Sequence, residues 1–326
     1  MALRFPHEIK PVTEEEDLIL KKYYKGYSRP FVRVGAPGYL STPGYQDHAE
    51  DIYNLEIRPD DIWVIPFSRS GTTWLQELVW LVNNNLNYVA AASEPLNKRY
   101  AYIEHVTQKS DAAKKMPQSS RPEQRATFES FETLPNLPSP RYVKSHLPLS
   151  RLPPALLDTA KVFYIARDPR DVAVSLYFAD KLFGYFSDEV TFKEFWDLFK
   201  RDLVLHTPIF SHVKEAWEKR HNPNLFFLFY EDMQNNLPSV IDKVCNFLNK
   251  AYTVEQKAEL ARHLSFESMK KTSTYSKLSK GENSFFRKGK SGSWVEYFDD
   301  AMKEEAMEFM EKNLSDTDMR FPVVEI

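Results

Sequence analysis

The chain has 326 residues, a length that one α/β domain built on a continuous sheet can fill. Its formal net charge is −3, so no overall positive field favours binding to a nucleic-acid backbone or to an anionic membrane. Hydrophobic residues make up 42% of the chain and aromatic residues 14%, which is enough for a sizeable core and for an apolar pocket.

The start of the chain does not resemble a targeting segment. Residues 1–20 carry several charges and contain no apolar run of the kind that a signal peptide needs. The single cysteine, Cys245, can form no internal disulfide and is interpreted as a small core residue. Apolar runs such as residues 225–230 are too short to span a bilayer. We therefore expect a cytoplasmic protein with no membrane partner and no nucleic-acid partner.

The first confident strand follows a long aromatic segment. Residues 28–60 are rich in Pro, Gly and Tyr, and we expect residues 1–60 to form an irregular N-terminal entry segment. Residues 62–65 are an unbroken apolar run, which is typical of a strand covered on both faces. After a turn, Leu75, Leu78, Val79 and Val82 recur at helical spacing. This pattern predicts a strand–loop–helix unit.

The same alternation returns along the chain. Residues 142–144, 162–166 and 225–230 are predicted strands. A helix is expected to begin after Asp168 and Pro169 and to run to about residue 183. Further helix starts are marked by Thr191 with Glu194, Thr207 with Pro208, and Thr253 with Gln256. The sequence thus predicts an α/β fold in a single domain over residues 1–326, with a mostly parallel β-sheet flanked by helices on both faces.

Two segments lack this periodicity. Residues 92–140 hold many Pro, Ser, Gln and Lys, and residues 272–293 are polar with several glycines. Long irregular stretches inside a compact domain are usually lids or binding loops. We expect both to cover a ligand, which in a parallel sheet binds beyond the carboxyl ends of the strands.

The loop at residues 68–74, S-R-S-G-T-T-W, has the chemistry of an anion cradle. It leads into a helix, whose first N–H groups and positive dipole end attract anions, and Ser70, Thr72 and Thr73 add hydroxyl donors. On this segment alone, a Ser/Thr-capped helix without a ligand stays equally open. The triphosphate motif G-x-x-x-x-G-K-[ST] is absent, which makes a nucleotide or nucleoside kinase a remote alternative. We expect charge neutralisation by Arg69, Lys144 and backbone dipoles, without a metal.

Three further clusters carry candidate functional residues. Lys144 and His146 lie at the exit of a predicted strand, where a neutral imidazole could take a proton from a hydroxyl group. Arg167 follows the next strand, and Ser175 lies two turns into the helix after it, so both could reach one phosphate. Arg170 and Asp171 are interpreted as solvated charges of the first helical turn. The loop R-K-G-K-S-G at residues 287–292 gathers cations and glycines, which suits a second phosphate site or, by itself, a flexible surface loop.

Together the four clusters resemble the cytosolic sulfotransferase family, from about residue 62 to the helix after Trp294. The family's aromatic-P-K-S-G-T-T-W loop is similar to F-S-R-S-G-T-T-W at residues 67–74. Its K-[ST]-H-L-P is intact at residues 144–148, and its Y-x-x-R-N-x-x-D-x-x-V-S matches residues 164–175 except at Asp168. Its R-K-G-x-x-G matches residues 287–292. The resemblance implies a P-loop-like phosphosulfate site for 3′-phosphoadenosine-5′-phosphosulfate (PAPS), with the product PAP and no metal.

The resemblance also implies a role for each matching residue. His146 would be the general base, and Lys144 and Arg69 would stabilise charge on the transferring group and on the leaving oxygen. Trp74, Phe266 and Tyr230 would hold the adenine. The PAPS-binding residues would be Arg69, Ser70, Gly71, Thr72, Thr73, Trp74, Arg167, Ser175, Tyr230, Phe266, Arg287, Lys288 and Gly289. The 3′-phosphate would be held by Arg167, Ser175, Arg287, Lys288 and Gly289.

The acceptor is expected to be a small hydrophobic phenol or alcohol, in the range of steroids, retinoids and xenobiotics. Residues 99–104, R-Y-A-Y-I-E, are similar to a family segment that would place Tyr102 at the pocket wall beside Lys144 and His146. The sequence departs from the family at Arg69, where Lys is usual, and a similar Arg occurs in an insect-type retinol dehydratase. A dehydratase-like reaction through a sulfated intermediate, and a non-catalytic PAP or hydrophobic-ligand carrier, therefore stay open.

The family's dimer motif K-x-x-x-T-V-x-x-x-E would fall on residues 295–304. Of its defining residues only Glu304 is kept, and Asp299 and Asp300 replace Thr-Val. The sequence therefore leaves the oligomeric state undecided.

Overall fold

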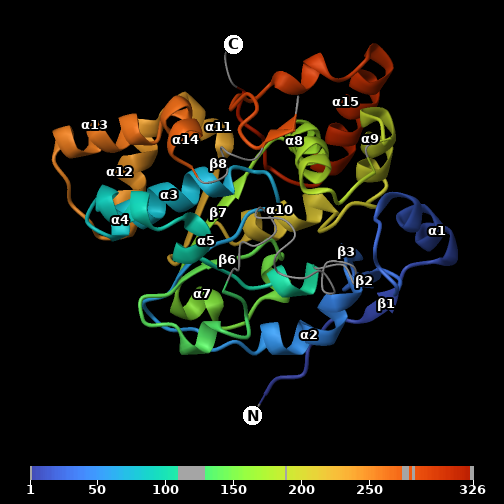
Figure 1. Cartoon of the computed structure of the whole chain (residues 1–326), viewed down its shortest axis with the longest axis horizontal. Helices are drawn as coiled ribbons and strands as arrows, with labels where there is room; N and C mark the ends of the chain where they lie inside the picture. Colours follow the sequence, from blue (N-terminus) through green and yellow to red (C-terminus); the bar gives the residue numbers. More distant parts are fainter. Residues whose placement is uncertain (1, 109–128, 188, 274–278, 281–282, 324–326) are drawn as a thin grey trace.

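The computed structural model describes residues 2–108, 129–187, 189–273, 279–280 and 283–323. Its centre is a five-stranded sheet in the order β5-β6-β4-β7-β8, and every pair of neighbouring strands is parallel (Figure 1). The strands are β4 (Ile62–Val64), β5 (Ala101–Tyr102), β6 (Tyr142–Lys144), β7 (Lys161–Ala166) and β8 (Leu225–Phe229). The predicted α/β fold and its four predicted strands are confirmed, while the short edge strand β5 was not expected.

Apolar side chains alternate between the two faces of this sheet. In β4, Ile62 and Val64 join one buried cluster, and Trp63 joins the other. In β7, Phe163 and Ile165 point to the first cluster, and Tyr164 to the second. Burial on both faces explains why these strands are continuous apolar runs in the sequence.

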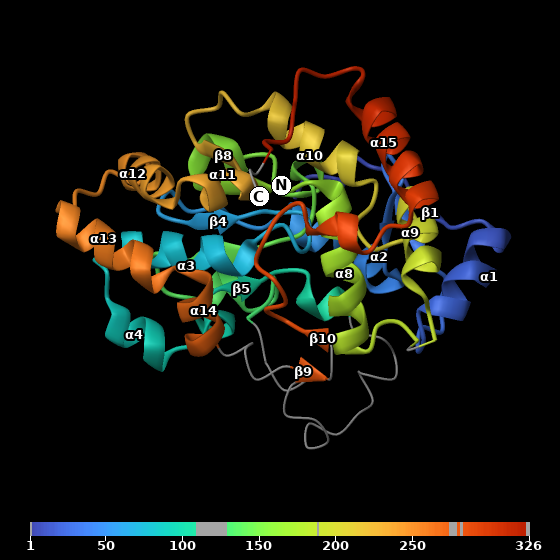
Figure 2. The same cartoon turned by 90° about the horizontal axis from the view of Figure 1, so that it is seen from above.

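Helices cover both faces (Figure 2). One face carries α3 (Thr72–Asn83), α12 (Leu237–Phe247), α13 (Val254–His263) and α14 (Phe266–Thr272). The other face carries α8 (Pro169–Phe183), α9 (Phe192–Lys200), α10 (Ile209–Glu218) and α15 (Asp300–Leu314). The remaining described helices are α1 (Glu14–Tyr23), α2 (Pro43–Tyr53), α4 (Tyr88–Ser93), α5 (Leu96–Arg99), α7 (Leu156–Thr159) and α11 (Tyr230–Asn235).

Local capping sets the ends of α8 as the sequence predicted. The Asp168 carboxylate accepts a hydrogen bond from the Arg170 N–H at 2.9 Å, and Pro169 occupies the first helical position. The helix ends at Gly184, whose φ of 72° lies in the left-handed region that favours glycine. Capping boxes start α9 at Thr191 and α13 at Thr253, which confirms those two predicted helix starts.

The N-terminal segment is more regular than the sequence suggested. Residues 1–60 were expected to be irregular, but they contain α1, α2 and a three-stranded antiparallel sheet of β1 (Ile9–Pro11), β2 (Val32–Val34) and β3 (Tyr39–Ser41). Strands of three residues are too short to show a clear alternation in sequence, and β1 pairs with a strand that lies beyond α1. Side chains of this segment, among them Tyr45 and Ile52, pack into the core that holds α8, α9 and α10.

The two segments expected to cover a ligand are only partly described. Within residues 92–140, the structure shows α5, β5 and the short 3-10 helices η1 (His105–Gln108) and η3 (Leu134–Asn136), and residues 109–128 lie outside the described part. Within residues 272–293, β9 (Ser279–Lys280) pairs with β10 (Asn283–Ser284). The 3-10 helices η4 (Leu149–Arg151) and η6 (Ser293–Glu296) complete the elements. The covering role of both segments stays a prediction.

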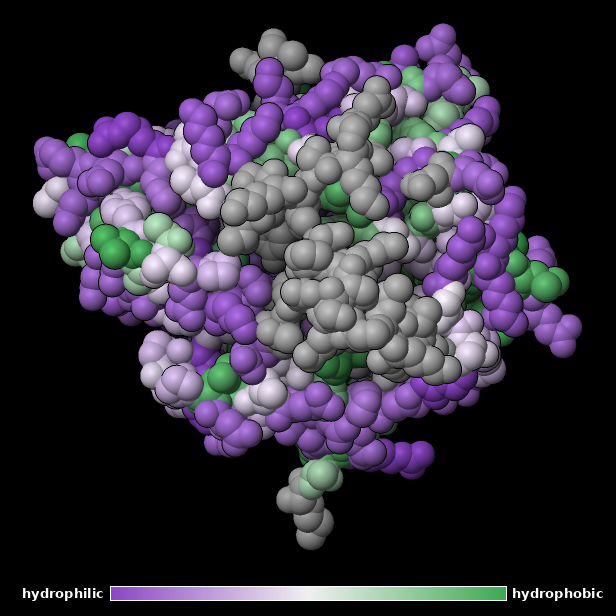
Figure 3. Space-filling view, viewed as in Figure 1, coloured by the Kyte–Doolittle hydropathy of each residue, from purple (hydrophilic) through white to green (hydrophobic). Residues whose placement is uncertain are grey.

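On the face drawn in Figure 3, the coloured hydrophobic residues outside the part covered by grey atoms are scattered among hydrophilic ones. The exposed large hydrophobic side chains come from separate elements, for example Leu18 of α1, Val89 of α4 and Met307 of α15. In the described part of the chain, no helix is both long and apolar enough to cross a membrane. Cys245 is buried in α12 and free, as expected.

Candidate active site at the carboxyl edge of the sheet

The loop between β4 and α3 has a backbone shape that only a few residues allow. Arg69 and Gly71 have φ angles of 66° and 104°, both in the left-handed region. At Gly71 a Cβ atom would lie 2.5 Å from the Tyr230 ring, so the side-chain-free residue is needed for close packing as well as for conformation. The loop therefore packs closely against the start of α11, and α3 begins directly after the turn at Gly71.

Donor groups without partners line this loop. The Ser70 hydroxyl and the Trp74 indole N–H are buried and have no hydrogen-bond partner among the described residues. Because α3 begins at Thr72, the first N–H groups of Thr72 and Thr73 have no intrahelical acceptor. Buried donors left without partners cost folding free energy unless a ligand accepts from them. The loop is therefore suited to an anionic ligand, as the sequence predicted.

Three arginines gather beside the loop. Arg167 donates to the carbonyl oxygens of Arg69 at 3.3 Å and of Lys290 at 3.1 Å, and its Nε has no partner among the described residues. Burial and then repulsion from Arg167 and Arg287 lower the pKa of Arg69 to about 10, and burial also lowers the pKa of Arg287. Both guanidinium groups stay protonated near neutral pH.

Buried carboxyl groups lie close enough to act on this cluster, but burial weakens their negative charge. Asp171 acts on Arg167 and Arg287, and Asp180 acts on Arg69, while burial raises the pKa of both carboxyl groups, that of Asp180 to about 8. Arg69 Nε donates to Ser175 Oγ at 3.2 Å, its Nη2 donates to the Phe285 carbonyl at 3.1 Å, and its guanidinium lies 4.5 Å from the Phe285 ring centroid. Neutral oxygens and rings thus hold the arginines in place, which leaves a net positive site for an anion.

The loop at residues 287–292 is fixed to the rest of the site by polar side chains from α8 and α11. Asp171 accepts from the backbone N–H of Gly292 at 2.6 Å and of Trp294 at 3.1 Å. Gln234 donates to the Gly289 carbonyl at 2.6 Å and accepts from the Ser291 N–H at 2.8 Å. The interpretation of this segment as a flexible surface loop is wrong, because its backbone polar groups are engaged by partners from α8 and α11.

The interpretation of Asp171 as a solvated charge is also wrong. Its side chain is 1% exposed and faces the loop instead of the solvent. The D of the family pattern Y-x-x-R-N-x-x-D-x-x-V-S falls on Asp171. This match was the signal in the sequence that could have marked Asp171 as more than a solvated charge. Arg170 is likewise not a free surface charge, since it pairs with Asp168 at 2.6 Å and lies 4.2 Å from the Trp294 ring centroid.

Aromatic rings lie on the far side of the loop. Trp74 meets Tyr230 edge to face, with ring centroids 5.6 Å apart. Phe266, at the start of α14, packs on Gly289, where a Cβ atom would lie 2.1 Å from the ring. The structure therefore places Trp74, Tyr230 and Phe266 around the loops that carry the arginines.

His146 follows β6 and has a defined tautomer. Its Nδ1 lies 2.9 Å from the Pro66 carbonyl oxygen, which can only accept, so Nδ1 carries the proton and Nε2 keeps its lone pair. Burial, with repulsion from Lys144 and His206, lowers the pKa of His146 well below its ordinary value. The imidazole is thus neutral near pH 7 and can accept a proton at Nε2.

Lys144 and Tyr102 lie next to this imidazole. The Lys144 Nζ is 4.1 Å from the Tyr102 ring centroid, and the Tyr102 and His146 ring centroids are 5.5 Å apart. Burial lowers the pKa of Lys144 to about 8, against the attraction of Glu104, and repulsion from Arg69 adds to the lowering. Lys144 therefore lies within electrostatic reach of both the imidazole and the arginine cluster.

Glu104 positions the segment that carries His146, a role that the sequence did not suggest. Its carboxylate accepts from the His146 backbone N–H and, at 3.0 Å, from the Ser145 hydroxyl. His212 adds a second restraint, since its Nε2 lies 3.0 Å from the His146 carbonyl oxygen while Tyr164 hydrogen-bonds its Nδ1. These contacts fix both sides of the peptide that holds the imidazole.

The structure brings most of the predicted site residues to the carboxyl edge of the sheet. Lys288 is the exception, because its ammonium pairs with Glu296 near the surface. Arg287 donates to the Tyr297 hydroxyl at 2.5 Å, but it stays close enough to lower the pKa of Arg69. Ser175 reaches the site as the partner of Arg69.

Comparison with known proteins agrees with this geometry. A family model described as "Sulfotransferase domain" matches residues 59–318. Luciferin sulfotransferase of Photinus pyralis is 34% identical over 277 residues, covering 82% of this chain and 73% of the relative. Sulfotransferase 1 family member D1 of Mus musculus is 32% identical over 283 residues, covering 84% of this chain and 90% of the relative.

Solved structures give the same result. Retinol dehydratase in complex with androsterone and inactive cofactor PAP superposes with a TM-score of 0.90 at 38% identity, covering 98% of this chain and 99% of that chain. A mouse sulfotransferase complexed with PAP has the same fold, with a TM-score of 0.65 at 24% identity and coverage of 86% and 93%.

The packing of Phe266 on Gly289 generates a testable prediction. In Gly289→Ala the new methyl group would collide with the ring, so Phe266 must move and titrated PAP should bind at least about tenfold more weakly, the loss expected for about 1.4 kcal/mol. Gly184→Ala is the matched control, because Gly184 has a similar positive φ but no atom within 4 Å of the place where a Cβ atom would lie. Calorimetric titration measures both variants, and equal loss of affinity in the two would contradict the prediction.

Proposed function

The chain belongs to the sulfotransferase family, and from this premise we propose that His146 is the general base that takes the proton from an acceptor hydroxyl. The protein is a PAPS-dependent sulfotransferase that acts on small hydrophobic acceptors. The observation that carries the assignment of His146 is its tautomer. The Pro66 carbonyl binds the Nδ1 proton, and the depressed pKa keeps Nε2 free to accept another.

The residues of the carboxyl edge fit PAPS by three independent features. The Ser70 hydroxyl and Arg167 Nε are buried donors that lack partners in the described chain. Gly71 and Gly289 let the rings of Tyr230 and Phe266 approach the two loops more closely than a Cβ atom would allow. Arg69, Arg167 and Arg287 supply more positive charge than their neighbours neutralise. When bound, PAPS supplies the sulfuryl group that the acceptor receives.

We assign the residues to its two ends. The loop from Arg69 to Thr73 would hold the phosphosulfate end, with Lys144 and Arg69 stabilising the charge that develops there. Arg167, Arg287 and the backbone of Gly289 would hold the 3′-phosphate, with Lys288 at its outer side. Ser175, which accepts from Arg69 Nε, would also hold the 3′-phosphate. Trp74, Phe266 and Tyr230 would enclose the adenine.

The acceptor side is formed by the wall around His146. Tyr102 presents an aromatic face beside the imidazole, and Lys144 lies over that face. Aromatic walls favour flat or conjugated apolar alcohols and phenols. Because a neighbour at 38% identity was solved with retinol and with androsterone, alcohols of retinoid or steroid size are the first acceptors to test.

His146→Ala should abolish transfer and leave PAP binding intact. Loss of a general base lowers turnover by roughly 100- to 10,000-fold. The measurement is transfer of labelled sulfate from PAPS to a panel of apolar alcohols, with calorimetric titration of PAP on the same preparation. His221→Ala is the control, since that histidine is exposed.

ADP serves as the ligand control. It lacks the 3′-phosphate and should bind more weakly than PAP, because each charge-assisted hydrogen bond contributes about 1.5–3 kcal/mol. Full activity of the alanine variant would remove His146 from the role of base. Equal affinity for PAP and ADP would instead contradict the proposed 3′-phosphate site and favour a kinase-type ligand.

The pKa of Lys144 predicts an alkaline loss of efficiency. Its folded-state pKa of about 8 means that the ammonium is charged below pH 8 and neutral above it, so kcat/KM for PAPS should fall as the pH rises through about 8. The pKa of His146 lies well below 6.5, so its imidazole is already neutral at that pH. Its titration should therefore cause no change in kcat/KM between pH 6.5 and 8. Lys144→Arg keeps a cation at this position, so the alkaline limb should disappear from its pH profile, and persistence of the same limb would exclude Lys144 as its origin.

A dehydration outcome is the second candidate, and Arg69 is the observation that favours it. Arg69 stands where the family has Lys, and its bulky planar guanidinium can neutralise charge but cannot mimic a compact ammonium group. A similar Arg occurs in the retinol dehydratase type of enzyme noted above. With retinol as acceptor, chromatography of the products should show either the sulfate ester or the dehydrated hydrocarbon.

Arg69→Lys tests the dependence on this residue. If Arg69 favours elimination, the lysine variant should shift the products toward the stable sulfate ester. An unchanged product ratio would mean that Arg69 does not decide the outcome. Activity that appears only in the lysine variant would instead identify the natural protein as a non-catalytic carrier.

A further inference from the structure

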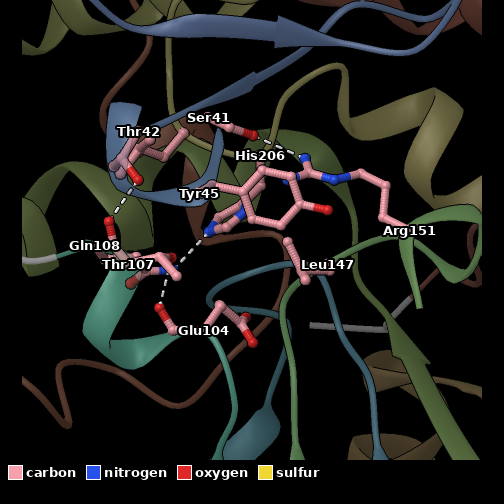
Figure 4. A pocket seen from close by; sticks show the side chains of 10 residues that line it. Ser41, Thr42, Tyr45, Glu104, Thr107, Gln108, Leu147, Arg151 and His206 are labelled. Carbon is pink, nitrogen blue, oxygen red and sulfur yellow. Dashed lines mark hydrogen bonds between the residues drawn. The ribbon is translucent and has the colours of Figure 1, made fainter. Parts of the chain in front are cut away.

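Gln108 lies between two residues of the acceptor side. It is the last residue of η1, and its amide oxygen accepts from the Tyr102 hydroxyl at 3.0 Å, while its amide nitrogen lies 3.1 Å from His206 Nε2. The amide and the His206 ring line one small cavity, and Figure 4 shows the hydrogen bond between them. A single side chain thus joins the proposed wall of the acceptor side to a residue that lies 98 positions further along the chain.

The hydrogen bond to Gln108 decides which part of Tyr102 faces a ligand. A phenol hydroxyl has one proton, and Tyr102 donates it to the amide oxygen. The Tyr102 ring meets the His146 ring edge to face at an interplanar angle of 80°, and the Lys144 Nζ lies 4.1 Å from the Tyr102 ring centroid. Tyr102 therefore offers its aromatic ring beside the imidazole, while its hydroxyl proton stays bound to the amide, and such a wall suits an apolar acceptor.

His206 is a fixed partner for the same amide. Its side chain is buried, and its backbone N–H donates to the Leu40 carbonyl of β3 at 3.0 Å. Its φ of 72° lies in the left-handed region, which a residue other than glycine keeps only where its surroundings hold it there. Burial, with repulsion from Arg151, lowers the pKa of His206 well below its ordinary value, so the ring is neutral near pH 7 and its Nε2 can accept the amide proton.

The N-terminal segment fixes the backbone of η1 from another side. The Thr42 hydroxyl donates to the Thr107 carbonyl at 2.7 Å, and the Tyr27 hydroxyl donates to the Gln108 carbonyl at 2.6 Å. At Gly44 of α2 a Cβ atom would lie only 2.5 Å from the Thr107 carbonyl oxygen, so α2 packs directly on this backbone. The Gln108 side chain therefore extends from a backbone position that three contacts hold.

We propose that Gln108 is a positioning residue for acceptor binding, because its amide holds the Tyr102 hydroxyl and so fixes the Tyr102 ring beside His146. This inference rests on the proposed function and extends it by a residue that acts through Tyr102. His206 and the N-terminal segment serve the same role one step further away, since they hold the amide and the backbone of Gln108.

The physical reason is that a buried hydrogen bond costs more to break from one side than from both. Removal of one partner leaves the other with a desolvation cost, whereas replacement of both partners by apolar groups of similar shape is nearly neutral. Without the amide, the Tyr102 hydroxyl would lose its acceptor at the wall against which an apolar ligand packs. Gln108 should therefore affect how tightly an acceptor binds, and should leave the chemical step and the affinity for PAP unchanged.

Gln108→Met tests this role, since methionine has a similar length and removes both hydrogen bonds of the amide. The KM for retinol or androsterone should rise about fivefold, the factor that corresponds to about 1 kcal/mol, and kcat should stay within about twofold of the natural value. A merely structural loss would instead lower kcat, through a smaller folded fraction, and leave KM unchanged. Gln46→Met is the matched control, because Gln46 is an exposed glutamine of α2, and its KM should not change.

Tyr102→Phe completes a double-mutant cycle. Alone, it removes the hydroxyl from the Gln108 amide oxygen, and the acceptor KM should rise. Combined with Gln108→Met, it removes both partners, so the KM of the double variant should fall below that of Gln108→Met. Losses that add in the double variant would overturn the proposal, as would a natural KM in Gln108→Met. Should Gln108→Met fail to fold, a natural KM in Tyr102→Phe would overturn it equally.

Calorimetric titration of retinol or androsterone into the PAP complex separates this inference from the proposed function. The titration needs no transfer, so Gln108→Met should weaken binding whether or not the natural chain forms a product. Transfer by the natural chain together with unchanged acceptor binding in Gln108→Met would overturn the positioning role and leave the function in place. Failure of both acceptors to bind the natural chain would overturn the acceptor wall and, with it, the role of Gln108.

Discussion

The active site depends on the repulsion among Arg69, Arg167 and Arg287. These three cations come from three separate segments, and the fold gathers them at the carboxyl edge of the sheet. The nearby carboxyl groups of Asp171 and Asp180 act on them, but burial raises the pKa of both carboxyl groups. Carbonyl oxygens, a hydroxyl and aromatic rings also hold the arginines in place. Concentrating like charges in a buried place lowers the stability of the free protein, and the same arrangement gives a dianionic ligand a large gain on binding.

Polar residues outside the proposed ligand contacts hold the arginines and the loop at residues 287–292 in position. Asp171 and Gln234 fix the loop at residues 287–292, and Glu231 ties Ser291 to the start of α8. Because these hydrogen bonds are buried or partly buried, loss of one partner would leave another group unsatisfied. The two ends of the proposed PAPS site are therefore coupled mechanically through α8 and α11, and changes at Asp171 would act on binding through the position of Arg287.

On the acceptor side, too, the residues that hold the reacting groups are different from the reacting groups themselves. Pro66 sets the tautomer of His146, and Glu104 sets the position of its backbone. Tyr102 is fixed in turn by Gln108 and His206. The reacting groups are few, and most buried polar residues around them serve to hold them.

The sequence determined the alternation of strands and helices, and with it the edge of the sheet where Arg69, His146 and Arg167 must meet. It could do so because apolar runs, helix caps and the loop at residues 68–74 are local patterns. Tertiary structure alone decided that Asp171 is buried, that the N-terminal segment pairs into a sheet, and which two side chains Gln108 joins. Each of these depends on contacts between residues far apart in the chain, and no local pattern records which partner a charged or polar side chain will find.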